Sequence, residues 1–319
     1  MRKSVVVAAI FVVLTCFAQP DLFAAPFFQG KTVRILVGAS PGGAFDLWAR
    51  VVSRHIGRHI PGNPLVMVEN VPGAGHLIMT NQFARATKPD GLTIAHINGG
   101  LILAQMLGQP GYDFDPQKFI YIGAANKEND VFFFSKRSGI TSIDNMIRLA
   151  KEVLGFPTQI ITGYKGTADT LIATDSGELA GGPSSWDTVK ANRKKALETG
   201  DTIIALQCVA KPLKELPKVP TMIQFAKTDE QKKLIGIVAH DYNDYSRPFA
   251  VPQGTPKDRV EMLRKAFQEM IKDKEFLAEV DKMNFTLDPT TADDLTRAVA
   301  NITKVDPAMK AKLKEILFK

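Results

Sequence analysis

The feature that most constrains this chain is an apolar stretch that stops at a glycine loop and continues as a helix. Residues 32–37 read Thr-Val-Arg-Ile-Leu-Val, residues 40–43 read Ser-Pro-Gly-Gly, and apolar residues then recur with helical spacing from Phe45. This order predicts a strand, a tight turn and a helix. The first N–H groups of a helix have no partner within it, and the helix dipole makes that end positive. The loop is therefore suited to bind an anion.

The same design recurs twice. Residues 65–70 form a second apolar run, which is followed by Val-Pro-Gly-Ala-Gly at 71–75 and a helical pattern from Leu77. Residues 92–97 form a third run, which is followed by Asn98-Gly99-Gly100 and a helix. Strands that alternate with helices predict an α/β fold with a mostly parallel sheet and helices on both faces. Ligands of such sheets bind beyond the carboxyl ends of the strands, where these loops fall. For the third loop, a structural turn and a ligand contact remain equally open.

A second series of strands and helices predicts a second lobe. It contains strand patterns at 131–134, 159–164, 202–209 and 235–240, and a helix from Ser142 to Leu154. Asp187 is expected to cap a further helix. The long C-terminal helices have no strands of their own and are expected to pack on the first sheet. We therefore predict that residues 26–130 and 241–319 form lobe 1 and that residues 131–240 form lobe 2.

The N-terminus predicts export. Arg2 and Lys3 precede an uncharged apolar run, and small residues follow at Ala24 and Ala25. This is typical of a secretory signal peptide, which we assign to residues 1–25. Thr15 disfavours lipid attachment at Cys16. Removal of the leader leaves Cys208 as a single thiol, which cannot form an internal disulfide and is expected to be a buried small side chain.

Charge and motifs argue against several classes of function. The chain has 319 residues and a net charge of +7, which is diffuse and favours no nucleic-acid partner. His55 and His59 have the spacing of metal ligands, but Arg54 and Arg58 would repel a cation, so no metal site is predicted. No catalytic residue and no cofactor site is predicted, because the chain lacks a dinucleotide fingerprint, a phosphate-binding loop and a nucleophile elbow.

Six motifs occur in an order that is familiar from one family. They are residues 33–46, residues 68–75, Ala86-Thr87-Lys88-Pro89-Asp90-Gly91-Leu92-Thr93, Tyr164-Lys165-Gly166, Val219-Pro220-Thr221 and residues 251–256. The chain resembles the substrate-binding proteins of tripartite tricarboxylate transporters, which are Bug-type periplasmic solute receptors. The resemblance implies the two-lobed type II periplasmic binding protein fold, with a mostly parallel sheet flanked by helices in each lobe.

The resemblance also implies a ligand site between the lobes. Backbone N–H groups and ordered water at the first two loops would hold a carboxylate, which assigns to the site Ser40, Gly42, Gly43, Phe45, Asp46, Gly73, Ala74 and Gly75. Asp46 is expected to cap its helix rather than touch the carboxylate, because like charges repel. From the residues themselves we add Tyr164 and Lys165 at a strand end. We also add Trp186, whose segment differs from the family's form and which fits an apolar core equally well.

The chain departs from the family in lobe 2. One helical stretch leads directly to the strand at 159–164, so an expected strand and its ligand loop are absent and lobe 2 is predicted to be shortened. The implied function is a monomeric periplasmic receptor that is not an enzyme and that delivers a small carboxylate to membrane transporter subunits. A receptor for a signalling kinase and, more remotely, an exported enzyme that acts on a carboxylate remain open alternatives.

Overall fold

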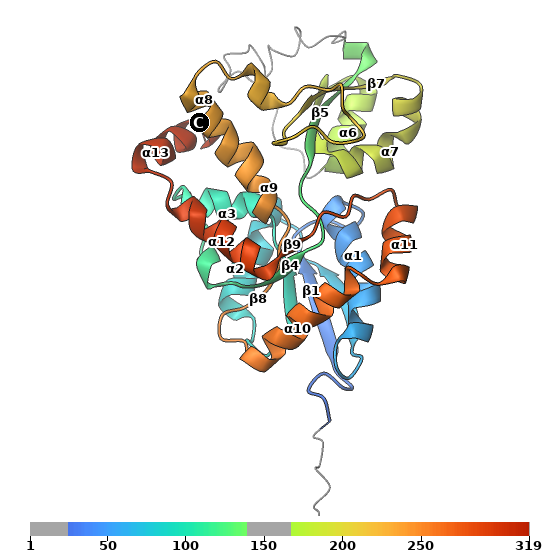
Figure 1. Cartoon of the computed structure of the whole chain (residues 1–319), viewed down its shortest axis with the longest axis vertical. Helices are drawn as coiled ribbons and strands as arrows, with labels where there is room; N and C mark the ends of the chain where they lie inside the picture. Colours follow the sequence, from blue (N-terminus) through green and yellow to red (C-terminus); the bar gives the residue numbers. More distant parts are fainter. Residues whose placement is uncertain (1–24, 139–166, 319) are drawn as a thin grey trace, which may run out of the picture.

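The computed structural model describes residues 25–138 and 167–318, which form two sheets with helices around them. Figure 1 shows the second sheet above the first, with the chain crossing between them before β5. The predicted signal peptide lies outside the described residues except for its last position. The predicted helix from Ser142 to Leu154 and the strand at 159–164 also lie outside them.

The first sheet is mixed, with strands in the order β2-β1-β3-β8-β4-β9. β1 (Thr32–Val37) pairs in parallel with β2 (Leu65–Asn70) and β3 (Thr93–His96). β8 (Phe249–Val251) is antiparallel to β3 and to β4 (Ile120–Ala124), and β9 (Thr290–Thr291) is antiparallel to β4. The predicted common direction is therefore correct for β1, β2, β3 and β4, whereas β8 and β9 run opposite to them. The reason is that β8 belongs to the returning C-terminal part of the chain, which enters the sheet in the opposite direction.

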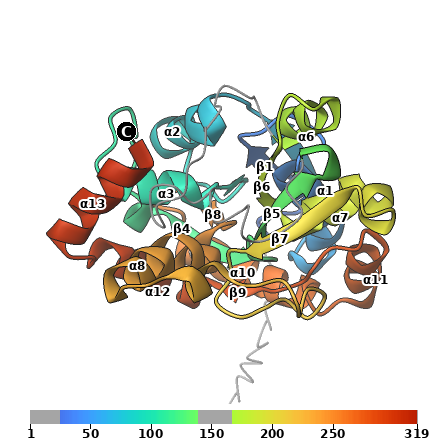
Figure 2. The same cartoon turned by 90° about the horizontal axis from the view of Figure 1, so that it is seen from above.

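Alternating side chains of β1 divide the core between the two faces of this sheet. Val33 and Ile35 pack with one set of helices and Leu36 packs with the other. The first set is α1 (Ala44–Ile56), α10 (Lys257–Met270) and α11 (Lys274–Lys282). The second set is α2 (Leu77–Ala86), α3 (Gly99–Met106), α12 (Ala292–Thr303) and α13 (Pro307–Phe318), which lies on the opposite side of the molecule in Figure 2. The C-terminal helices thus pack on the first sheet, which confirms that prediction.

The second sheet, in the order β6-β5-β7, is antiparallel in its described pairs. Its strands are β5 (Asp130–Ser135), β6 (Gly181–Ser185) and β7 (Thr202–Gln207), with α6 (Thr167–Ser176) and α7 (Trp186–Glu198) beside them. For the described strands of this sheet, the prediction of mostly parallel pairing is wrong. β6, α7 and β7 do form a strand–helix–strand unit, but β5 arrives from the first sheet in the opposite direction and lies between the two strands.

Residues 229–245 form helical turns instead of the strand predicted at 235–240. α8 (Asp229–Ile235) continues through a π-helical turn (Gly236–Asp241) into α9 (Tyr242–Tyr245). Short apolar runs fit either a buried strand or a helix that is buried on two sides. The second case applies, because Leu234 lies in the core of the first sheet and Ile235 packs with Cys208. The predicted lobe boundary at 240/241 falls inside this helical segment, and the division into lobes stays a prediction.

Short 3-10 turns complete the described elements, and they are Gly57–His59, Ala74–His76, Pro116–Lys118, Lys136–Ser138 and Met222–Phe225. Cys208 is buried, as predicted. At the start of α7 the cap is Ser185, whose hydroxyl accepts from Thr188 N, rather than Asp187. The Asp187 carboxylate instead accepts from the backbone N–H of Thr286 at 3.0 Å and from its hydroxyl at 2.7 Å. Asp187 therefore ties the second sheet to the segment before β9.

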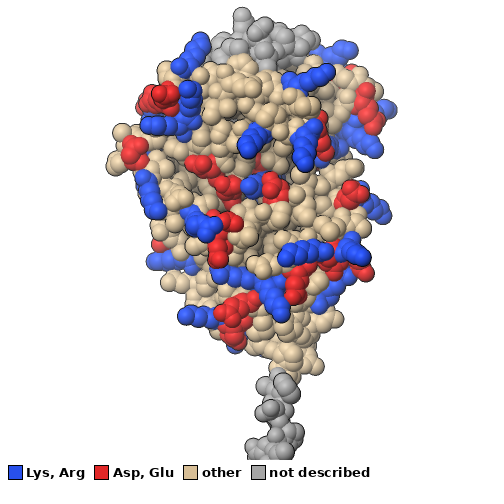
Figure 3. Space-filling view, viewed as in Figure 1, with Lys and Arg blue, Asp and Glu red and all other residues tan. Residues whose placement is uncertain are grey.

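The surface carries charges of both signs. Figure 3 shows Lys and Arg interspersed with Asp and Glu on the face that it displays. Among the described residues, no helix is long and apolar enough to cross a membrane.

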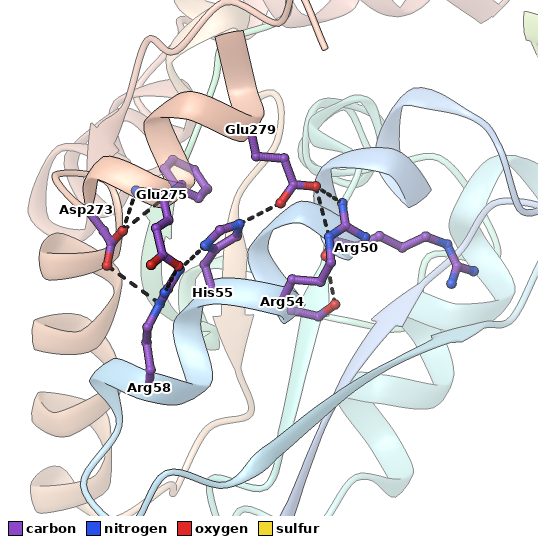
Figure 4. A network of polar contacts seen from close by, with 9 residues as sticks. Arg50, Arg54, His55, Arg58, Asp273, Glu275 and Glu279 are labelled. Carbon is purple, nitrogen blue, oxygen red and sulfur yellow. Dashed lines mark hydrogen bonds and ion pairs between the residues drawn. The ribbon is translucent and has the colours of Figure 1, made fainter. Parts of the chain in front are cut away.

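The two histidines with metal-ligand spacing belong to a polar network between α1 and the start and body of α11. His55 Nε2 donates to Glu279 Oε2 at 2.6 Å, and His59 Nε2 donates to Asp273 Oδ2 at 3.0 Å. Arg54 also pairs with Glu279. Figure 4 shows Arg54 and His55 pointing toward Glu279 across the two helices. The network joins α1 to α11, and so ties the N-terminal part of the first sheet's helices to the C-terminal part.

This network predicts a loss of stability in acid. Burial raises the pKa of Glu279, but the hydrogen bonds from Arg54 and His55 outweigh it and hold the pKa below the ordinary value of 4.5. A carboxylate whose pKa is lowered by folding adds stability above its unfolded pKa and loses it as the pH falls through the folded pKa. We expect the free energy of unfolding, measured by urea denaturation at about pH 6 to 3, to fall less steeply in Glu279→Gln than in the wild type. The exposed control Glu198→Gln should keep the wild-type slope, and equal slopes in all three proteins would contradict the expectation.

Candidate functional site

The first glycine loop is held by the Asp46 carboxylate. Asp46 lies in the first turn of α1, and its Oδ2 accepts from Gly42 N and from Arg50 Nε, both at 2.8 Å. Its Oδ1 accepts from Asn70 Nδ2 at 2.9 Å. The structural cap of α1 is Gly43, so Asp46 fixes the loop from inside the helix instead of occupying the cap position.

These contacts keep Asp46 ionised. Burial of the carboxylate raises its pKa, but the hydrogen bonds from Arg50, Gly42 and Asn70 outweigh burial, and the net pKa lies below the ordinary value. The Asp46 side chain is 2% exposed, and each of its carboxylate oxygens accepts at least one hydrogen bond. Asp46 therefore shapes the loop from inside α1, and the prediction that it caps this helix is wrong because Gly43 occupies the cap position. That Asp46 does not touch a ligand stays a prediction.

The second glycine loop is joined to the first. Asn70, the last residue of β2, donates from Nδ2 to Ala39 O at 2.9 Å as well as to Asp46. Val71 N donates to Val37 O at 2.8 Å. At Gly38, a Cβ would lie 2.6 Å from His76 Cα, so only glycine lets β1 end so close to the second loop.

The second loop has an unusual backbone. Ala74, Gly75 and His76 have positive φ angles of 45°, 60° and 78° in succession. Left-handed residues other than glycine are uncommon, and such strain persists only where surrounding contacts hold it. Here His76 is buried against Gly38 and Phe45, while Ala74 and Gly75 are exposed. The exposed residues of the loop thus present backbone groups to the surroundings.

Both loops lead into helices whose starts carry no capping side chain. The cap residues of α1 and α2, Gly43 and His76, make no side-chain hydrogen bond to the helix. The third loop differs, because Asn98 Oδ1 accepts from Gly100 N at 2.8 Å and caps α3. A Cβ at Gly99 would lie 2.5 Å from Tyr245 O, which explains the glycine by packing. The third loop is therefore a structural turn, and the first two are the candidate site.

A buried polar cluster, which we call the Arg247 cluster, lies behind the first loop. It consists of Arg247, Glu128, His76 and His96 around the ring of Phe45. Arg247 donates from Nη2 to Glu128 Oε1 at 2.6 Å and from Nε to Glu128 Oε2 at 3.0 Å. The guanidinium carbon lies 4.8 Å from the centre of the Phe45 ring. The ring centre lies 4.4 Å and 4.9 Å from those of His76 and His96, respectively.

Burial sets the protonation states in the cluster. Burial and then Arg247 lower the pKa of His76 to about 4, and the same causes hold the pKa of His96 well below its usual range. Both imidazoles are therefore neutral near pH 7. Burial opposes the charge of Arg247, but contact with Glu128 outweighs it and raises the pKa. Sequence reasoning missed Arg247 and Glu128, because 119 residues separate them.

Of the three residues predicted for lobe 2, Trp186 lies within the described part of the chain, and it packs away from the two glycine loops. Trp186 is 8% exposed, packs with Val131 and Val189, and its indole N–H donates to Glu215. The structure thus favours the core role that the sequence left open for Trp186. Tyr164 and Lys165 lie outside the described residues. Their assignment stays a prediction.

Comparison with known proteins begins with partial sequence matches. No protein-family model matches the chain. A UPF0065 protein of Cupriavidus necator, from the gbd 5′ region, is 35% identical over 91 residues, which are 28% of this chain and 27% of the relative. A UPF0065 protein of Bordetella pertussis is 40% identical over 70 residues, which are 22% of this chain and 21% of the relative. The chain thus matches about a quarter of the length of these curated relatives.

Comparison with solved structures covers nearly the whole chain. The periplasmic binding protein BugD has a TM-score of 0.68 at 20% identity and covers 91% of this chain and 98% of its own. MatC of Rhodopseudomonas palustris with bound malate has a TM-score of 0.68 at 16% identity, with 90% and 100% covered. An R. palustris protein with adipate has a TM-score of 0.71 at 17% identity, with 89% and 97% covered. The chain has the two-lobed fold of periplasmic binding proteins. The predicted resemblance to Bug-type proteins is confirmed at the level of this fold.

The contact between the loops predicts a contrast between two glycines. In Gly38→Ala the new Cβ meets the His76 backbone, and overpacking should destabilise the protein by about 1–3 kcal/mol. In the control Gly43→Ala the nearest atom is Ser40 O at 3.8 Å and φ is −76°, so stability should change by less than about 0.5 kcal/mol. Urea denaturation without ligand measures both. Equal denaturation midpoints would contradict the close packing of the loops.

Proposed function

We propose that this protein is an exported, periplasmic solute receptor of the Bug type, which binds a small carboxylate at the first two glycine loops. It then delivers the ligand to the membrane subunits of a tripartite tricarboxylate transporter. The observation that carries the proposal is that α1 and α2 both start without a capping side chain. Their two loops are joined by the hydrogen bond from Asn70 to Ala39 and by the close approach of Gly38 to His76. The first N–H groups of a helix lack partners within it, and together with the helix dipole they favour an anion.

Two further observations support a carboxylate. Ser40, Gly42, Ala74 and Gly75 are exposed, so a ligand can reach the backbone of both loops. Two structural neighbours carry malate and adipate, which are small carboxylates. The proposed site residues are Ser40, Gly42, Gly43, Phe45, Gly73, Ala74 and Gly75, with Asp46 holding the loop.

The first test is a binding screen. Protein freed of endogenous ligand by unfolding and refolding is heated with di- and tricarboxylates, aromatic acids and amino acids. At least one carboxylate should raise the melting temperature, because a ligand that binds only the folded state stabilises it. Calorimetry then gives the Kd, and NMR of the incubated ligand should show it unaltered, as expected for a receptor. A screen with no thermal shift for any acid would contradict the proposal.

The second test concerns Gly43. Gly43→Val should abolish carboxylate binding while the melting temperature without ligand stays near that of the wild type. The side chain would occupy the approach to the loop N–H groups, whereas in the folded protein the new Cβ meets only Ser40 O, at an ordinary contact distance of 3.8 Å. Calorimetry with the acid found in the screen measures the affinity. Wild-type affinity in this variant would remove the first loop from the site.

A further inference from the structure

The Arg247 cluster contains a donor that the fold does not use. Arg247 is 2% exposed, and its Nη1 has no hydrogen-bond partner among the described residues. Buried donors are almost always paired, and an unpaired one calls for an explanation such as a bound water or ligand. A guanidinium carries five N–H donors in a rigid plane. Glu128 occupies the edge formed by Nε and Nη2, so Nη1 points away from Glu128.

The position of Arg247 is fixed by the backbone around it. Ile97 N donates to Pro248 O at 2.9 Å, and Gly99 N donates to Ser246 O at 2.8 Å. These bonds hold Arg247 beside the carboxyl end of β3, the edge of the sheet at which both glycine loops begin. Little rotational freedom remains for the side chain, because Glu128 holds one edge of the guanidinium and Phe45 lies under its plane.

Phe45 connects the guanidinium to both loops. It is the second residue of α1, and its ring contacts both the guanidinium of Arg247 and the imidazole of His76. His76 in turn ends the strained second loop. The unpaired Nη1 therefore belongs to the same group of packed side chains that positions the N–H groups of both loops.

Arg247 is paired with Glu128, but its charged guanidinium still offers an unused donor at Nη1 among the described residues. Arg50 forms an ion pair with Asp46. The neutral imidazoles of His76 and His96 add no positive charge. Asp130 is the first residue of β5, and its pKa is raised well above its usual range by burial and by Glu128. It therefore adds less negative charge to this region than an ordinary aspartate would. A hydrogen bond from a charged donor is about twice as strong as a neutral one.

We propose that Arg247 is a ligand-binding residue, whose Nη1 donates to the carboxylate held by the backbone of the two glycine loops. This inference rests on the proposed carboxylate receptor function and assigns to it the charged donor that backbone N–H groups cannot supply. The planar guanidinium favours a planar carboxylate, and Glu128 fixes the guanidinium through Nε and Nη2 while Nη1 is left for the ligand.

The test removes the charge of Arg247 without leaving Glu128 as an unpaired buried ion. The double variant Arg247→Gln/Glu128→Gln is compared with the single variant Glu128→Gln, which keeps the arginine. With malate and adipate as probes in calorimetry, the double variant should bind about 10- to 100-fold more weakly than Glu128→Gln. Equal affinities of the two variants would overturn the proposal.

A matched control comes from the second sheet. Arg193 is also buried, has an unpartnered Nη1 among the described residues, and lies over the ring of Phe133, as Arg247 lies over Phe45. Arg193→Gln should retain wild-type affinity because Arg193 does not contact the loops. An equal loss in Arg193→Gln would mean that any buried arginine affects binding through stability, which would overturn the specific role of Arg247.

A crystal structure of the wild-type complex with the tighter-binding probe gives a second readout if the double variant does not fold. A carboxylate oxygen within about 3 Å of Arg247 Nη1 supports the proposal, and a water molecule in that place overturns it. The two proposals fail in different ways. A wild-type protein that binds no carboxylate contradicts the receptor function, whereas a wild-type protein that binds well without using Arg247 contradicts only this inference.

Discussion

The geometry of the candidate site depends on one buried carboxylate. Asp46 accepts hydrogen bonds from its own loop at Gly42, from its own helix at Arg50, and from the neighbouring strand at Asn70. One side chain thereby fixes a turn, a helix start and the end of β2. An ionised group that is 2% exposed is stable only with such partners. Asp46 thus allows the loop to leave its remaining N–H groups without an internal cap.

The sequence predicted the parts of the fold that depend on local pattern. The strand–glycine–helix order placed β1, β2 and β3 correctly, because each unit combines a strand period, a turn and a helix period within some 25 residues. The sequence prediction was wrong where contacts between distant segments determine the direction of a strand or the type of element. β8 is a three-residue strand whose direction follows from the returning chain, and residues 235–240 became helical because two separate cores cover them. Their apolar residues alone fit either structure.

The same distinction applies to the candidate site. The glycine loops are visible as motifs, but sequence reasoning assigned Asp46 to the helix cap, a position that the structure gives to Gly43. It left the third loop open, because only the structure shows that Asn98 caps α3. It missed Arg247 and Glu128, which lie far apart in sequence and belong to no motif. Glu128 lies just before β5 and Arg247 lies just before β8. Their pairing therefore depends on how the whole fold brings these two segments together.

The left-handed run at Ala74, Gly75 and His76 has a consequence for how the site forms. Such a backbone costs energy in isolation, and it persists here because His76 is enclosed by Gly38 and Phe45 of the first loop. The backbone of the second loop therefore depends on its packing against the first, and we expect the two loops to form together. Free-energy changes from substitutions in the two loops will not add, because whichever substitution comes first already releases the strain that the other would have released.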